Sequence, residues 1–159
     1  MLQVSASLWS LTGFKGMIKS GCNETTLPQE YDAIMDINLR VPFILTQFFL
    51  EMLTETKGCI VNLSSDKGSK AEPGQIAYCM SKAGIEMLTK ASAMELALAG
   101  VRVNAVAPSF VDTNFYRAAG MPEQDYDGLK LRAKANIPLQ RIAQESEIAK
   151  AIIFLTSEQ

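Results

Sequence analysis

The chain has 159 residues, of which 48% are hydrophobic and 20% are charged, so it is expected to bury one core and to form one folded unit. Its net charge of −2 gives no electrostatic reason to expect a nucleic acid or an anionic membrane as a partner. Histidine is absent from the sequence, which excludes catalytic triads and metal sites that depend on imidazole.

The N-terminal 24 residues show neither helical nor strand periodicity and hold three glycines, so an irregular segment is expected there. Residues 1–23 lack Asp and Glu and carry Lys15 and Lys19 among several serines. This composition leaves a mitochondrial targeting sequence as an alternative to the cytoplasmic location that we expect. The longest apolar runs are interrupted well before eighteen residues, so a membrane span is not expected.

The first regular element is expected to be a helix from Pro28 to Lys57, with Thr26 near its start as the N-cap. Its apolar residues lie on more than one face, as in a helix that is covered from two sides. Pro42 is expected to bend this helix near its middle.

Two short runs rich in β-branched residues, 59–63 and 101–107, predict strands. Between them lie a polar loop over residues 66–74 and a helix over residues 75–98, which ends before Gly100. One side of this helix is a methionine-rich stripe that we interpret as core or subunit interface. The stripe consists of Met80, Ala83, Met87, Ala91, Met94 and Leu98.

Residues 109–140 are polar and are interrupted by glycines and prolines, so a lid or binding loop is expected there. A last helix is expected over residues 146–157. Helix, strand, helix, strand, lid and helix follow one another along the chain. This order predicts an α/β fold with parallel strands and right-handed crossovers.

The three cysteines, Cys22, Cys59 and Cys79, are an odd number and show no CxxC spacing. Neither a disulfide framework nor a thiolate metal site is therefore expected, and a reducing compartment fits best.

The residues with the clearest chemical meaning are Ser65, Tyr78 and Lys82. Tyr78 and Lys82 stand four residues apart, so a helix would place the ammonium beside the phenol. A neighbouring cation favours the phenolate, so the pKa of Tyr78 is expected to fall below its usual ~10. Ser65 would lie at the carboxyl edge of a parallel sheet, where ligands bind. Taken alone, a Tyr and a Lys at this spacing are more often a part-buried aromatic and a solvated charge.

Four segments together resemble the short-chain dehydrogenase/reductase family: Asp-Ile-Asn-Leu-Arg (36–40), Ile-Val-Asn-Leu-Ser-Ser (60–65), Tyr-Cys-Met-Ser-Lys (78–82) and residues 101–113. Their order and separations agree with the family from Glu30 to Leu155. The resemblance implies the second half of a Rossmann-type, doubly wound parallel sheet, formed by residues 25–159. It also implies NAD or NADP as cofactor and a small-molecule carbonyl or alcohol as substrate.

By the same resemblance, Tyr78 is the general acid/base, Lys82 binds the nicotinamide ribose and Ser65 holds the substrate oxygen. Asn38 would hold a water in a proton relay. The cofactor-binding residues implied are Tyr78, Lys82, Pro108, Val111 and Thr113, of which Val111 and Thr113 would contact the nicotinamide carboxamide.

The sequence departs from the family at the site for the cofactor's phosphates. Residues 12–16 hold two glycines three positions apart, and no apolar strand precedes them, so they do not fit a pyrophosphate-binding turn. Ser109 also stands where the family has glycine after Pro108. The family's first half and final strand are expected to be missing. The chain by itself is therefore not expected to bind NADH or NADPH at micromolar concentration.

Two parallel strands would leave both sheet edges open, and the helices are apolar on more faces than a small sheet can cover. A homo-oligomer or association with a related subunit is expected, since in the family such helices pack into a four-helix interface between subunits. Three hypotheses remain open at this point. The chain could be an oxidoreductase, a non-catalytic chain that binds a full-length relative, or a fragment with no independent role.

Overall fold

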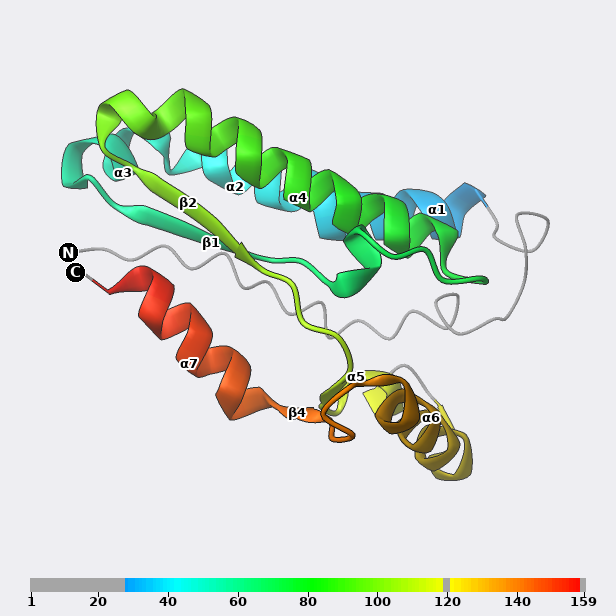
Figure 1. Ribbon diagram of the computed structural model, residues 1–159. Helices are drawn as coiled ribbons and strands as arrows, with labels where there is room; N and C mark the ends of the chain where they lie inside the picture. The colour runs from blue at the N-terminus through cyan, green and yellow to red at the C-terminus, as the bar shows by residue number, and fades with distance from the viewer. Residues whose placement is uncertain (1–27, 119–120, 158–159) are drawn as a thin grey trace.

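The fold is a two-stranded parallel sheet between two layers of helices (Figure 1). The computed structural model describes residues 28–118 and 121–157, so the irregular segment expected over residues 1–24 lies outside the described residues. Strands β1 (Cys59–Leu63) and β2 (Arg102–Val106) pair in register, with Cys59 opposite Arg102. Helix α4 (Ile76–Leu96) covers one face and α7 (Glu145–Thr156) covers the other. The expected α/β class with parallel strands is confirmed.

The expected first helix is divided into α1 (Pro28–Met35), a π-helical turn η2 (Asp36–Arg40), α2 (Val41–Phe48) and α3 (Leu50–Thr56). The bend expected at Pro42 is wrong, because Pro42 stands in the first turn of α2, where proline is tolerated. The axis instead turns by 57° at Phe49. Lys57 then adopts a left-handed conformation, with φ 49°, and ends α3.

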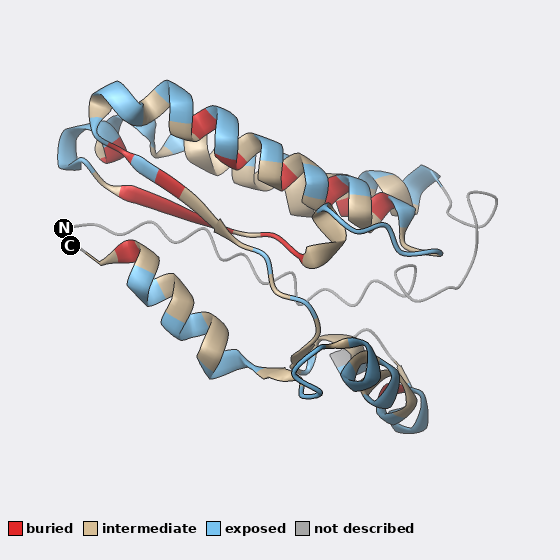
Figure 2. Cartoon of the chain, viewed as in Figure 1, coloured by how far each residue is buried: buried red, intermediate tan, exposed pale blue. Residues whose placement is uncertain are grey.

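The core lies where α3 and α4 meet the sheet. Leu53, Ile60, Val101 and Val103 form its buried cluster, and partly buried residues of α4 pack against them. Four of the five residues of β1 are buried, because helices cover both faces of the strand (Figure 2). Asn62 is among them, and its Nδ2 donates to Thr89 Oγ1 over 2.9 Å, so its amide is hydrogen-bonded within the core.

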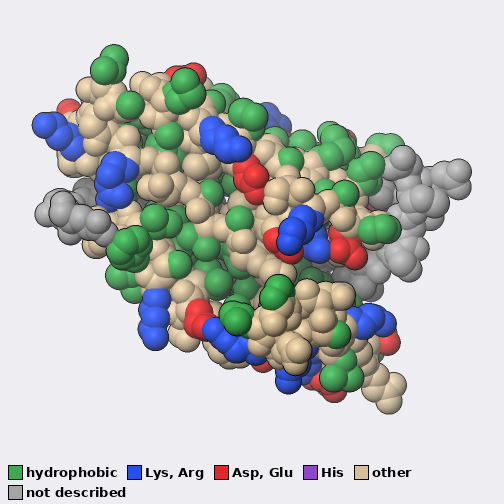
Figure 3. Space-filling model, viewed as in Figure 1, with side chains coloured by type: hydrophobic (Ala, Val, Ile, Leu, Met, Phe, Trp, Pro, Cys, Tyr) green, Lys and Arg blue, Asp and Glu red, His purple; other side chains and the backbone are tan. Residues whose placement is uncertain are grey.

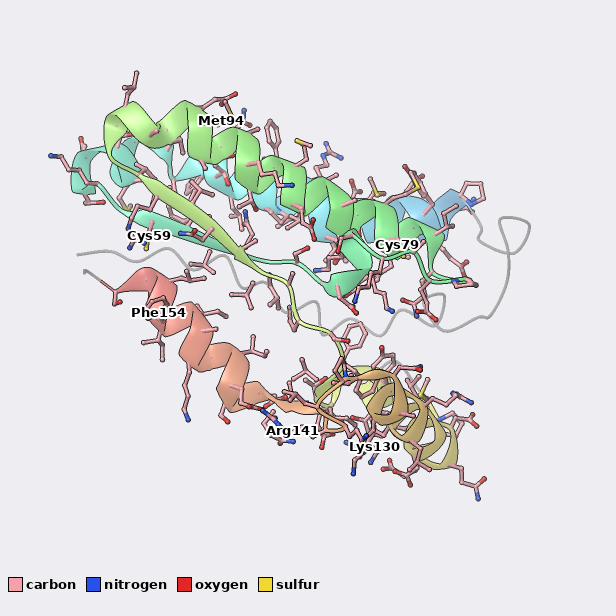
Figure 4. All side chains as sticks on the ribbon, viewed as in Figure 1. Cys59, Cys79, Met94, Lys130, Arg141 and Phe154 are labelled. Carbon is pink, nitrogen blue, oxygen red and sulfur yellow. The ribbon has the colours of Figure 1, made fainter. Side chains whose placement is uncertain are left out.

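The methionine-rich stripe of α4 does not enter this core. Met80, Met87 and Met94 are 46%, 63% and 81% exposed, so the core interpretation is wrong within a single chain. Hydrophobic side chains recur along the outer side of α4, where Met94 points away from the sheet (Figures 3 and 4). Neighbouring α2 also exposes apolar residues: Phe43, Ile44 and Phe48.

Residues 109–140 are not the irregular loop expected from their composition. They contain β3 (Val111–Asp112), α5 (Phe115–Ala118) and α6 (Glu123–Asn136), and β3 pairs in parallel with β4 (Ala143–Gln144). Helix α6 buries one residue, Tyr126. A helix anchored by a single side chain has no apolar stripe, which is why periodicity does not reveal it.

In residues 28–118 and 121–157, no single helix is long and apolar enough to cross a membrane. The bent pair Pro28–Phe48 and Leu50–Thr56 passes that test on length and composition alone. In the same ranges, His, Cys, Asp and Glu form no group of three that could hold a metal ion. Cys59 and Cys79 are free thiols, Cys59 being buried.

We predict that Leu53→Ala lowers the free energy of unfolding by about 2–5 kcal/mol, because Leu53 is 1% exposed and its loss leaves a cavity in the core. Leu131→Ala is the matched control, since Leu131 on α6 is 71% exposed and its removal should cost less than about 0.5 kcal/mol. Denaturant unfolding followed by circular dichroism measures both. Equal losses in the two variants would contradict this position of the core.

Candidate active site

The candidate site lies at the carboxyl ends of β1 and β2, which remain hydrogen-bonded beyond the last strand residues. Ser64 N donates to Val106 O over 2.8 Å, and Asp66 N donates to Pro108 O over 2.9 Å. Ser65 is extended, and its Oγ accepts from Lys67 N over 3.2 Å, capping a short 3-10 turn η3 (Asp66–Gly68). This backbone pairing places Ser65 and Pro108 at the edge where open α/β sheets bind ligands.

Helix α4 brings Tyr78 and Lys82 to the same edge. The Nζ atom of Lys82 lies 5.6 Å from the centroid of the Tyr78 ring and donates to Leu63 O over 2.8 Å. The Ser65 side chain is close enough to the Tyr78 phenol to lower its pKa. The structure therefore assembles the three residues that the sequence singles out, two from α4 and one from the end of β1.

The electrostatics of this cluster differ from the sequence expectation. Burial raises the pKa of the Tyr78 phenol above 10.0, and the Ser65 side chain only partly opposes it. The lowering expected from Lys82 is therefore wrong, because loss of water around the phenol dominates its pKa and Lys82 is not among the groups that shift it. Burial also lowers the pKa of Lys82 from 10.5 to about 8, so the ammonium is still mostly protonated at pH 7.

A second group of residues, which sequence reasoning missed, joins the Ser65 loop to α4. Ser64 Oγ lies 3.2 Å from Lys82 O and 3.3 Å from Glu86 Oε1. A Cβ on Gly68 would lie 2.5 Å from Glu86 Oε1 and 3.0 Å from the Lys82 carbonyl carbon, so only glycine fits this close approach. Glu86 follows Lys82 by four residues and so shares its helix face, a signal that the sequence does contain.

Asn38 lies in the π-helical turn η2, a conformation that is frequent at functional sites. Its Nδ2 donates to Ser81 Oγ over 3.1 Å, and the fully buried Ser81 hydroxyl donates to Tyr78 O over 2.8 Å. Asn38 is thus connected to the backbone of the Tyr78 turn. Its expected role in holding a water stays a prediction.

The three remaining expected cofactor contacts follow β2. Pro108 accepts the hydrogen bond from Asp66 described above, and Val111 lies half-buried in β3. Thr113 Oγ1 accepts from Phe115 N over 3.1 Å at the start of α5. Their contact with a cofactor stays a prediction.

Aromatic side chains from the segment after β2 form a cluster that the sequence analysis did not identify. Phe110 and Tyr116 stack with ring centroids 5.3 Å apart, and the Tyr126 ring lies 6.0 Å from Tyr116. Burial, with a smaller effect from Tyr78, raises the pKa of Tyr116 to about 12. Tyr116 is therefore a neutral phenol in the electrostatic neighbourhood of Tyr78.

The chain is similar to known proteins in both its sequence and its fold. A family model described as enoyl-(acyl carrier protein) reductase matches residues 7–159. The 3-oxoacyl-(acyl-carrier-protein) reductase of Staphylococcus aureus is 40% identical over 132 residues, 82% of this chain and 51% of that protein. The reductase of the same name from Thermotoga maritima is 39% identical over 132 residues, with the same coverage. The chain spans about half the length of the curated relatives it matches.

Two solved structures are similar at the level of the fold and the sequence. A short-chain dehydrogenase/reductase of unknown function from Caenorhabditis elegans, solved with cofactor, has a TM-score of 0.78 and 32% identity, covering 83% of this chain and 50% of that one. A 4-hydroxyisoleucine dehydrogenase complexed with NADH has a TM-score of 0.75 and 30% identity, covering 89% and 57%.

We predict that Lys82 makes the stability of the chain depend on pH. Because its folded pKa of about 8 lies below the unfolded value of 10.5, the unfolded chain binds more protons between these values, and stability rises with pH. The free energy of unfolding should increase by roughly 2 kcal/mol from pH 8 to pH 10. Denaturant titrations at a series of pH values measure this slope.

Lys82→Met should abolish this rise, whereas Lys90→Met, on the exposed side of α4, should keep it. A slope that survives in Lys82→Met would show that another group carries the pH dependence.

Proposed function

We propose, because this chain belongs to the short-chain dehydrogenase/reductase family, that it carries the catalytic residues of an NAD(P)-dependent oxidoreductase acting on a carbonyl or secondary alcohol. One observation carries the proposal: Ser65, Tyr78 and Lys82 meet at the carboxyl ends of two paired parallel strands. The names of the relatives, two reductases and a dehydrogenase, agree with this reaction class.

Tyr78 is the proton carrier in the proposed mechanism. In reduction its Oη gives the proton to the substrate oxygen, which Ser65 Oγ holds by a second hydrogen bond, and in oxidation the phenolate takes the proton back. The bound nicotinamide supplies or accepts the hydride. Because burial raises the pKa of Tyr78, the phenol is protonated at neutral pH and suits the reductive direction. The Lys82 ammonium above the ring would stabilise the phenolate left behind.

The described residues fit the nicotinamide end of the cofactor. Lys82 has three donors and uses one on Leu63 O, which leaves two for ribose hydroxyls. The Thr113 hydroxyl accepts from Phe115 N and keeps its own proton for a carboxamide oxygen. Pro108 and Val111 complete the proposed contact. Residues 12–16, which the sequence analysis considered for the pyrophosphate, lie outside the described residues.

The exposed apolar face formed by α2 and the methionine-rich stripe favours association with a second copy or with a related subunit. This face also supports a second candidate function, a non-catalytic chain that binds a full-length relative. A cytoplasmic location completes the proposal. The mitochondrial alternative rests on residues 1–23, outside the described residues.

The test of the proposed function compares the chain alone with the chain joined to the dinucleotide-binding half of the Staphylococcus aureus relative. Alone, it should show no saturable binding of NADH or NADPH below about 10 μM in a fluorescence titration, about −7 kcal/mol of binding free energy. Joined, it should reduce ketones. In the joined protein, Tyr78→Phe should lower kcat by roughly 10²–10⁴-fold with little change in cofactor affinity, because only the proton carrier is lost.

Lys82→Ala should differ by weakening both kcat and cofactor binding. Tyr31→Phe, on α1, is the control and should leave both unchanged. A loss below tenfold in Tyr78→Phe would reject Tyr78 as the acid. An inactive joined protein would favour the second candidate.

A separate prediction concerns the exposed apolar face. The parent chain should be self-associated, and Met87→Glu should shift it towards a monomer near 17 kDa, because a carboxylate would be buried in the contact. Leu131→Glu, on an equally exposed site of α6, should not change the mass. Size-exclusion chromatography with light scattering measures it. A monomeric parent would contradict the proposed association.

A further inference from the structure

Helix α6 buries one side chain, Tyr126, against the segment that follows β2. Tyr126 is 0% exposed, and it is the only buried residue in Glu123–Asn136, a helix that is otherwise polar. A fully buried tyrosine on a polar helix needs a partner for its hydroxyl and a surrounding for its ring. Both come from the segment that follows β2.

The Tyr126 hydroxyl lies 2.8 Å from Asp112 Oδ1 and 3.2 Å from Thr113 O, so its one proton is shared between the two acceptors, with Asp112 the nearer. Hydrogen bonds to a carboxylate are about twice as strong as those between neutral groups. The two acceptors belong to the stretch that carries Val111 and Thr113, the proposed nicotinamide contacts. The Tyr126 hydroxyl therefore restrains the chain at residues 112–113, which carries the proposed nicotinamide contacts.

The ring of Tyr126 is fixed as firmly as its hydroxyl. The guanidinium carbon of Arg117 lies 4.3 Å from the ring centroid, and Lys130 Nζ lies 4.7 Å from it. Arg117 is itself held by two hydrogen bonds of 2.8 Å to Glu123. Burial and the Asp112 carboxylate raise the pKa of Tyr126 to about 12, so the hydroxyl stays a donor at neutral and mildly alkaline pH.

The same stretch is held on its other side by β4. Asp112 is opposite Gln144 in the β3–β4 pair, and Gln144 forms the capping box that starts α7. Residues 112–113 are thus held by the β3–β4 backbone pairing and by the Tyr126 hydroxyl. Only the second can be removed by a single substitution, Tyr126→Phe.

We propose that Tyr126 is a positioning residue: its hydroxyl clamps Asp112 and Thr113, and thereby sets where Val111 and Thr113 meet the nicotinamide ring of the cofactor. This role rests on the proposed function. Without the clamp, the backbone at residues 112–113 would keep its β4 pairing but lose its restraint from α6. The carboxamide contact would then be less well ordered, while Ser65, Tyr78 and Lys82 would stay in place.

The test uses the 159-residue chain and a probe of the nicotinamide end alone, reduced nicotinamide mononucleotide, followed by saturation-transfer NMR. Tyr126→Phe keeps the ring and removes the hydroxyl, so it should weaken binding of this probe about tenfold. Amide hydrogen exchange in residues 111–115 should speed up by a similar factor, while exchange in β1 stays as in the parent. Tyr31→Phe is the matched control and should change neither measurement.

Two further variants separate positioning from bulk stability. Asp112→Asn keeps an oxygen acceptor and should behave like the parent within a few-fold, whereas Asp112→Ala should reproduce the loss seen in Tyr126→Phe. Unchanged probe binding in Tyr126→Phe and Asp112→Ala would overturn this role and leave the proposed function standing. A parent chain that does not bind the probe would overturn the proposed nicotinamide contacts and this role with them. If hydrogen exchange in β1 also rises in Tyr126→Phe, that variant has lost overall stability. Probe binding is then compared between Asp112→Asn and Asp112→Ala: weaker binding in Asp112→Ala alone supports the positioning role, and equal binding in the two overturns it.

Discussion

The site depends on the hydrogen bonds by which β1 and β2 stay paired after their strands end. Ser64 N to Val106 O and Asp66 N to Pro108 O continue the parallel ladder by three residues, which is long enough to carry Ser65 and Pro108 to one edge. Ser64 is 3% exposed and follows a strand with four buried residues, so its backbone N–H has no water to bond with instead. The burial of the sheet thus fixes the relative positions of the two chain segments that build the site.

The same burial sets the chemistry of the catalytic pair. Removing water disfavours both the phenolate of Tyr78 and the ammonium of Lys82, and it moves their pKa values apart, to above 10.0 for Tyr78 and to about 8 for Lys82. Lys82 still donates to the Leu63 carbonyl, and the Ser65 hydroxyl lies close enough to Tyr78 to lower its pKa. A phenol that keeps its proton at neutral pH, beside a cation that can stabilise its anion, is suited to giving a proton away and taking it back.

Local sequence signals predict those elements whose ends are marked by residues next to them in the sequence. The β-branched run 59–63 lies between Gly58 and two serines, and the strand has those same bounds. Tyr78 and Lys82 could be paired from sequence because helical spacing alone brings them together. Tyr126 could not, because its partners Asp112 and Thr113 lie fourteen and thirteen residues away, at the end of β3 and just after it. The π-helical turn at Asn38 was also hidden, since apolar spacing does not distinguish it from α-helix.

The site lies between helix α4 on one side and helices α5 and α6 on the other, and these two walls differ in how they are attached to the core. The wall formed by α4 is continuous with the core, through Ser81, Ile85 and Thr89 and through the Ser64 and Glu86 contacts beneath Ser65. The wall formed by α5 and α6 is polar outside and is anchored by Tyr126 together with the short β3–β4 pair. Local opening costs least where few apolar contacts are broken, so the second wall is the part that can move without disturbing the first. Such a division suits a site that must hold a proton carrier rigidly and still admit and release its ligands.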